Sequence, residues 1–265
     1  MQTPASFFLL LLLSLAAVYT VLLKTGHLQE NFQGKSIINS FGMFIVIWSS
    51  VTIWMTDGSS HIQSDHWKSW ITLIIGFSML GLIDDVWGDS RYKGLRGHIR
   101  ALFLNGKVTT GLIKAMGGVV LSGWIAFHIV GTFTERIVGT LLIALSSNML
   151  NLLDLRPGRA NSIFLLIAAC VIVVHNIWPL QIVFLAALVA WPLDSRAVVM
   201  LGDCGSNMLG AVLGLSLVIV SSFAFQVVTV IILIILHFVL EQISLTKIID
   251  RSPILKRLDR MTGVR

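Results

Sequence analysis

The sequence predicts an all-α protein, a polytopic membrane helical bundle of about nine transmembrane helices with the N-terminus outside and the C-terminus inside. The composition is 55% hydrophobic and only 12% charged, whereas about a quarter of the residues of a soluble domain carry charge. Its apolar stretches approach the ~20 residues that are needed to cross a bilayer. Its lysines and arginines also gather on one side of the expected membrane.

The apolar stretches define the expected spans, which are 5–23, 37–55, 69–83, 109–130, 137–153, 162–177, 179–190, 207–222 and 225–240. The first could be mistaken for a secretory signal. However, MQTPASFF contains no basic residue and the apolar run is longer than that of a signal peptide, so we expect a retained helix. The third and seventh stretches are short, and a tilted, re-entrant or half-length helix would read the same way.

The direction of the chain follows from its basic residues, because lysine and arginine are retained on the cytoplasmic side. With the N-terminus outside, all of the 19 lysines and arginines except Lys68 and Arg136 fall in inner loops or at the inner ends of spans. The net charge of +6 therefore reflects membrane topology, and nucleic acid is not an expected partner. We expect a multi-pass protein of the cytoplasmic cell membrane.

No linker, low-complexity tract or repeat divides the chain, so we expect a transmembrane catalytic domain over residues 1–240 and a cytoplasmic tail over residues 241–265. The tail mixes apolar residues such as Ile254 and Leu258 with Lys256, Arg257 and Arg260. This pattern is typical of an amphipathic helix that lies on anionic headgroups.

Cysteine and histidine offer little chemistry outside the membrane. Cys170 and Cys204 are too few and too scattered for a disulfide framework, so two free thiols are expected. The outer loop 56–68 contains His61 and His66, which we interpret as solvated side chains and not as metal ligands.

Acidic residues at the inner membrane boundary are the strongest functional signal, because charges near membrane depth are expensive. Four lie at that level, at the ends of the third and fifth spans and the start of the eighth: Asp84, Asp85, Asp154 and Asp203. Asp84 and Asp85 are neighbours that point about 100° apart on a helix, so we expect different roles for them. The alternative is that they mark a helix end and neutralise Arg91 and Arg96.

Two further motifs accompany the acids. Asn148, Asn151 and Asp154 recur every three residues, so they either line a site or join helices through their amides. Arg156 and Arg159 follow at once, and two fixed cations suit phosphate oxygens.

The segment 202–206 reads GDCGS. Its glycines let a ligand approach the backbone at a helix N-terminus, although Asp203 or Ser206 could simply cap that helix. Together the acids favour a Mg²⁺ site over calcium or zinc, because Mg²⁺ takes one or two carboxylates and leaves its other positions to water and phosphates. Mn²⁺ is an alternative ion.

These motifs resemble those of the polyprenyl-phosphate N-acetylhexosamine-1-phosphate transferase superfamily, over nearly the whole chain. Asp84-Asp85 is similar to its paired aspartates, 148–154 to its N-x-x-N-x-x-D motif, and 202–206 to its G-D-x-G-S motif. Weaker matches are Lys35 with Gly42, Lys114, and Glu241-x-x-Ser244. Two features depart from the family: Pro157 stands where a second acid is usual, and the histidine-rich loop before a tenth span is missing.

The resemblance implies a Mg²⁺-dependent phosphoglycosyl transferase. It would move a sugar-1-phosphate from a UDP-sugar to a polyprenyl phosphate such as undecaprenyl phosphate, release UMP, and serve cell-wall biogenesis. By the same resemblance, Asp84 and Asp203 bind the metal, Asp85 assists the acceptor phosphate as a candidate base, and Asp154 and Asn151 position the donor. The remaining substrate-binding candidates are Lys35, Lys114, Asn148, Arg156 and Arg159.

Two other classes of function stay open at this level. The chain could be a non-catalytic polyprenyl-lipid-binding membrane protein, or a secondary transporter that couples ions through carboxylates. A homodimer is one option for its assembly.

Overall fold

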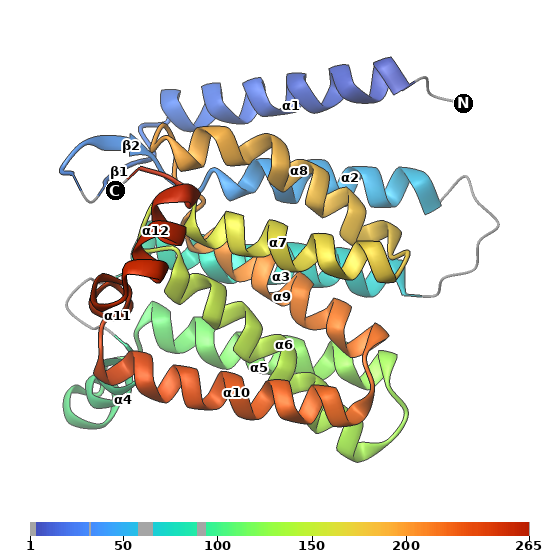
Figure 1. Ribbon diagram of the computed structural model, residues 1–265, viewed down its shortest axis with the longest axis vertical. Coiled ribbons are helices and arrows are strands. Elements are labelled where there is room, and N and C mark those ends of the chain that lie inside the picture. Colours follow the sequence, from blue (N-terminus) through green and yellow to red (C-terminus); the bar gives the residue numbers. More distant parts are fainter. Residues whose placement is uncertain (1–3, 32, 58–65, 89–93, 265) are drawn as a thin grey trace.

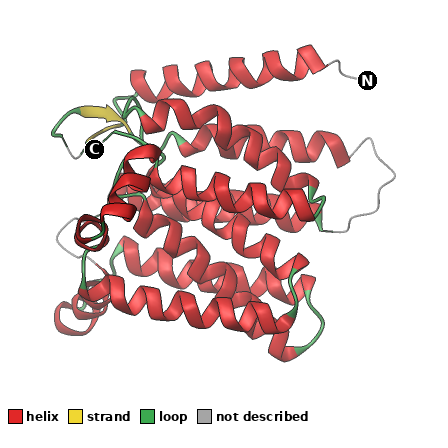
Figure 2. Cartoon of the chain, in the orientation of Figure 1, coloured by secondary structure: helices red, strands yellow, loops and turns green. Residues whose placement is uncertain are grey.

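The computed structural model describes residues 4–31, 33–57, 66–88 and 94–264. Long helices run alongside one another in a bundle, and shorter elements gather at one end of it (Figure 1). The helices are α1 (Pro4–Lys24), α2 (Gly42–Asp57), α3 (Trp67–Trp87), α4 (Gly94–Asn105), α5 (Thr110–Ile129), α6 (Phe133–Leu153), α7 (Arg159–Val174), α8 (Trp178–Ser195), α9 (Gly202–Val220), α10 (Phe223–Gln242), α11 (Leu245–Arg251) and α12 (Pro253–Thr262). Figure 2 shows how little of the described chain is not helical, which confirms the all-α class.

Six helices of the described chain are long and apolar enough to cross a membrane: α3, α5, α6, α8, α9 and α10. The apolar helices α2 and α7, and α1 counted from Phe8, are shorter. A helical membrane protein is therefore supported, while the count of nine spans and the direction of the chain stay predictions. The third and seventh expected spans are not half-length, because α3 continues through Asp84 and Asp85 and α8 continues through Pro192.

α9 is the central helix of the bundle. Within the apolar window of each helix, 78% of α9 is buried, against 11% of α10. Small residues explain the difference, since glycines on a membrane helix let neighbouring backbones approach closely. A β-carbon on Gly210 of α9 would lie only 2.6 Å from the Cα of Ser147 on α6. The helix that carries Asp203 in its first turn is thus packed closely against its neighbours.

A short hairpin lies at the same end of the bundle as α4, α11 and α12 (Figure 1). Strand β1 (Leu28–Glu30) pairs antiparallel with β2 (Ser36–Ile38). The N–H of Met200 donates to the carbonyl of Ile38 at 2.8 Å, and the N–H of Phe41 donates to the carbonyl of Met200 at 2.9 Å. These bonds attach the segment before α2 to the segment before α9, which the sequence did not predict because three-residue strands have no readable periodicity.

The loops, the two cysteines and the C-terminal tail were also the subject of predictions from the sequence. His61 of the outer loop lies outside the described residues, as do Arg91 and Lys93. Cys170 and Cys204 are free thiols, as expected. The tail contains α11 and α12, and Ile254, Leu258 and Met261 of α12 are exposed; contact of this helix with lipid stays a prediction.

The close approach of α9 to α6 predicts a matched pair of glycine substitutions. Gly210→Ala should lower the thermal unfolding midpoint of the purified protein, because overpacking of a tight contact costs about 1–3 kcal/mol. Gly123→Ala on α5 should not, since the nearest atom to its new β-carbon would be the Thr140 hydroxyl oxygen at 3.7 Å. Equal midpoints for the two variants would contradict the packing described for α9.

Candidate functional site

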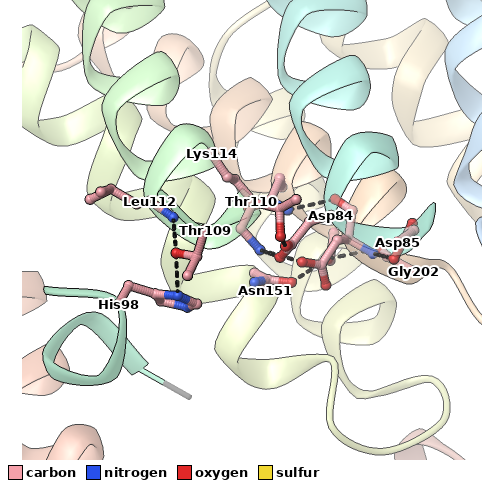
Figure 3. Close-up of polar contacts among 12 residues, drawn as sticks. Asp84, Asp85, His98, Thr109, Thr110, Leu112, Lys114, Asn151 and Gly202 are labelled. Atoms are coloured by element: carbon pink, nitrogen blue, oxygen red, sulfur yellow. Dashed lines mark hydrogen bonds and ion pairs between the residues drawn. The ribbon is translucent and has the colours of Figure 1, made fainter. Parts of the chain in front are cut away.

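Side chains from three helices meet around one ammonium group. Lys114, in the second turn of α5, donates to Asp84 Oδ2 at 2.7 Å and also pairs with Asp203 Oδ2. Thr110 donates its hydroxyl to Asp84 Oδ1 at 2.5 Å. Figure 3 shows Lys114 reaching from α5 toward Asp84 on α3. Asp84 and Asp203, far apart in the sequence, thus share a single partner.

Asn151 of α6 completes this group. Its side-chain amide satisfies its neighbours when its nitrogen donates to Asp203 Oδ1 at 2.8 Å and Ser206 Oγ at 3.0 Å, and its oxygen accepts from Lys114 Nζ at 3.3 Å. This orientation is assigned from the hydrogen-bond pattern. The ammonium group is therefore surrounded by oxygens from α3, α6 and α9.

Asp85 has a different set of contacts from Asp84. Its Oδ1 accepts from the N–H of Asp203 at 2.9 Å, and its Oδ2 accepts from the N–H of Cys204 at 3.1 Å and from the Ser40 hydroxyl at 2.6 Å. Ser40 has a positive φ of 56°, and its hydroxyl also lies 2.9 Å from His27 Nε2. Asp85 therefore supplies an N-terminal cap to α9 from another helix, which satisfies backbone donors that have no intrahelical partner.

Close helix packing makes this cap possible. A β-carbon on Gly81 of α3 would lie 2.6 Å from the backbone nitrogen of Cys204. Only glycine leaves room for α3 to lie against the first turn of α9. The approach places Asp85, one helical turn further along α3, directly at the free N–H groups.

Asp154 follows the last residue of α6 and lines the same cavity as Asp84 and Asp203. Burial away from water raises the pKa of the Asp154 carboxyl well above its ordinary value. The carboxylates of Asp194, Asp203 and Asp85 raise that pKa further, whereas the positive charge of Arg159 lowers it. Desolvation and neighbouring negative charge both favour the protonated form of this carboxyl.

The cavity has a volume of about 450 Å³ and lies where the ends of several helices meet the hairpin. Three walls surround the acids. The hairpin region contributes Gln29, Asn31 and Asn39, α4 contributes His98, and the segment after α6 contributes Asp154, Leu155, Arg156 and Pro157. Residues from the C-terminal ends of α3, α6 and α8 and from the N-terminal end of α9 also line it.

Of the remaining residues that were expected to bind substrate, one lines the cavity and three do not. Arg156 lines the cavity. Lys35 is exposed in the hairpin loop and Asn148 is exposed on α6, and neither lines the cavity. Three-residue steps drift by about 60° each around a helix, so Asn148 has rotated away from the face that carries Asp154. Arg159 is buried and binds Asp259, and it does not line the cavity.

Several residues of the cavity were not selected from the sequence. Asp194 lines it, and the rule that singles out acids at span ends would also have found this residue at the end of the seventh span. His98 lines it as well, and its Nδ1 lies 2.8 Å from the hydroxyl of Thr109. No periodicity marks His98, Thr110 or Ser40, because their roles depend on contacts between distant segments.

The donor set suits a divalent cation of the Mg²⁺ type. No group of three or more histidines, cysteines, aspartates or glutamates in the described part of the chain is close enough to hold an ion. The carboxylates of Asp84 and Asp203 nevertheless face one positive charge, with the Asn151 oxygen beside it. Mg²⁺ requires no more than one or two carboxylates when substrate phosphates supply other ligands, so these residues fit the ion.

The alternative expectation was that Asp84 and Asp85 only neutralise nearby arginines. In the structure the two acids have other partners. Both acids contact residues of α5, α9 or the segment before α2. Arg91 lies outside the described residues, and the side chain of Arg96 is not described. Known proteins do not add to this description, since neither models of protein families nor curated protein sequences match the chain.

The capping contacts of Asp85 predict a local effect of its substitution. Asp85→Asn should speed amide hydrogen exchange at Asp203 and Cys204 by about tenfold, because loss of a helix cap costs about 1 kcal/mol or more. Asp84→Asn should leave exchange at these two amides unchanged. Unaltered exchange in Asp85→Asn would show that the carboxylate does not hold the start of α9.

Proposed function

We propose that the protein transfers a sugar-1-phosphate from a UDP-sugar to a polyprenyl phosphate such as undecaprenyl phosphate and releases UMP. The reaction would take place at the cytoplasmic face of the cell membrane, in the biosynthesis of a cell-envelope glycan. The observation that carries this proposal is the meeting of Asp84, Asp203, Asn151 and Lys114 at one end of a membrane bundle, beside a cavity of about 450 Å³.

The position of the cavity suits two substrates of opposite character. A polyprenyl phosphate keeps its hydrocarbon chain in the bilayer and its phosphate at the interface, whereas a UDP-sugar arrives from water. The cavity lies among helix ends, which is where these groups can meet. Arg156 lines the cavity and Lys114 contacts the lining residues Asp84 and Asp203, so both provide cationic groups near phosphate oxygens there.

The ion and the lysine would have complementary tasks. Asp84 and Asp203 would hold Mg²⁺ or Mn²⁺, which when bound neutralises charge on the diphosphate of the donor. Lys114 contributes a positive charge that does not depend on the ion. Its contacts with both carboxylates keep their oxygens turned toward the same point.

The roles of the other acids follow from their surroundings. A phosphate monoester has its second pKa near ~6, so the acceptor is largely ionised at neutral pH and needs little help from a base. Asp85 is occupied by three donors, and we therefore assign it the positioning of Asp203. Burial raises the pKa of Asp154, which favours its protonated form, and we assign this residue the binding of the donor substrate through hydrogen bonds.

The two rival functions give different expectations. A secondary transporter usually places its ion-binding groups near the middle of the bilayer in broken helices, whereas Asp84, Asp154 and Asp203 lie at helix ends. A non-catalytic lipid-binding protein would bind polyprenyl phosphate without forming UMP. Release of UMP separates the proposed transferase from both of these functions.

The decisive experiment measures UMP released by purified protein from UDP-sugars, undecaprenyl phosphate and Mg²⁺. Asp203→Asn should reduce the rate by at least ~100-fold, because electrostatic stabilisation of a reacting phosphate is worth several kcal/mol. Chelation of the metal should abolish the rate, and Asp250→Asn on the exposed part of α11 should not change it. If Asp203→Asn were as active as the wild type, the proposed site would be wrong.

His98 yields a second prediction for the same assay. Its ring points from α4 toward the Asn151 side of the site (Figure 3), and its contact with Thr109 fixes the ring at the start of α5. His98→Ala should raise the KM for the donor by roughly 10-fold or more, since a hydrogen bond to a charged group contributes about 1.5–3 kcal/mol.

The matched control is His128→Ala, at the far end of α5 from Thr110. The His128 ring contacts the carbonyl of Trp124, so its removal should leave the KM for the donor unchanged. An unchanged KM in His98→Ala would exclude contact between this ring and the donor.

A further inference from the structure

We propose that Asp259 is a positioning residue for the candidate site. Through its ion pair with Arg159, it fixes the segment of residues 154–158 that forms one wall of the cavity. We call residues 253–264, which comprise α12 and the two residues after it, the C-terminal strap. The proposal concerns the shape of the cavity, and only its activity readout rests on the proposed function.

The ion pair joins residues that are 100 positions apart in the sequence. Arg159, the first residue of α7, donates from Nε to Asp259 Oδ1 at 2.7 Å and from Nη2 to Asp259 Oδ2 at 3.1 Å. Such a two-pronged contact between arginine and a carboxylate fixes orientation as well as distance. Only 2% of the Arg159 surface is exposed, so water contributes little to holding its charge.

Backbone contacts hold the strap just after the ion pair. The N–H of Val264 donates to the carbonyl of Ser195 at 2.9 Å. A β-carbon on Gly263 would lie 2.5 Å from the carbonyl oxygen of Pro157. The strap therefore lies directly against the backbone of two segments, one after α6 and one at the end of α8.

Gly158 marks the same contact from the other side. It adopts a positive φ of 72°, which glycine reaches without strain. A β-carbon there would also collide with the carbonyl oxygen of Thr262 and would lie 2.9 Å from Cα of Ser195. The chain turns sharply here between Pro157, which lines the cavity, and Arg159, which binds the strap.

These contacts reach the site through neighbours in the chain. The residues just before Gly158 line the cavity, from Asp154 to Pro157, and Asp194, just before Ser195, lines it too. The strap thus holds the ends of two cavity walls. Its displacement would change the positions of Asp154, Arg156 and Asp194 in the cavity.

The exposure of the strap and its buried ion pair indicate that it positions the cavity wall and adds little to the stability of the fold. Ile254, Leu258 and Met261 of α12 are all more than half exposed, and no residue of α12 is buried, so apolar burial does not account for its attachment. A buried ion pair contributes little net stability, but removal of one partner leaves an uncompensated buried charge. Arg159 Nη1 is itself buried without a hydrogen-bond partner among the described residues. Without Asp259, the Arg159 charge would have to move toward water or toward the cavity acids.

The test compares Asp259→Asn with Asp250→Asn in the full-length protein in lipid nanodiscs. Asp250 makes an exposed ion pair with Lys256 at 3.3 Å and is the matched control, since such pairs contribute little. Hydrogen exchange is measured over residues 154–162 and 192–198. We expect Asp259→Asn to speed exchange in both segments by about tenfold or more, with α5 and α9 unchanged, and Asp250→Asn to match the wild type.

Kinetics and rescue separate positioning from a merely structural role. In the UMP assay, Asp259→Asn should raise the KM for the donor at least about fivefold with a smaller change in kcat, and Asp259→Glu should recover part of the loss. If Asp259→Asn instead destabilised the whole bundle, the double variant Arg159→Gln/Asp259→Asn, which leaves no unpaired charge, would still report on the two segments. Fast exchange in those segments of the double variant would support the proposal.

Unchanged exchange over residues 154–162 in a folded Asp259→Asn protein would overturn the proposal, as would a uniform rise of exchange across all helices of the double variant. A wild-type protein that forms no UMP would contradict the proposed function alone. The exchange measurements would then still decide whether Asp259 fixes the cavity wall.

Discussion

The ammonium group of Lys114 between Asp84 and Asp203 is the interaction on which the arrangement of the site depends. Charges at the edge of a hydrocarbon layer are stable only when they are paired and hydrogen-bonded. Because the two acids come from α3 and α9 and the lysine from α5, this requirement fixes the relative positions of three helix ends. Two carboxylates around one ammonium also leave an excess of negative charge, which favours a further cation.

Backbone groups extend this constraint to the rest of the cavity. Asp85 satisfies the first N–H groups of α9, and the segment before α9 exchanges hydrogen bonds with the segment before α2. The backbone groups at these helix ends therefore depend on hydrogen-bond partners from other segments. The same helix ends also supply polar side chains that line the cavity. A change in one of these contacts would affect both the packing of the bundle and the chemistry available in the cavity.

The sequence predicted what depends on local pattern. Apolar runs located the helices, and the cost of charge in a membrane singled out Asp84, Asp85, Asp154 and Asp203, all of which line the cavity together with Asn151. The same patterns could not predict the hairpin, whose strands are too short. The every-third spacing of polar residues was a weaker guide, because it placed Asn148 with Asp154 although the helix turns them apart.

Contacts between distant segments account for the remaining differences. Arg159 was expected to bind phosphate beside Arg156, and nothing in its neighbourhood in the sequence indicates the carboxylate of Asp259. In the same way, the roles of Ser40 and His98 depend on which helix end lies opposite them. Spacing in a sequence carries no information about such encounters unless related sequences vary together.

The pairing of Asp84 with Lys114 also bears on how the chain enters the membrane. Both residues belong to helices that follow one another closely, α3 and α5, with only the short α4 between them. They can neutralise each other as soon as these two helices have been synthesised, long before Asp203 exists. A helical hairpin in which Lys114 offsets the charge of Asp84 partitions into lipid more readily than one that leaves both charges unpaired, so the pair can serve membrane integration before it serves any ligand.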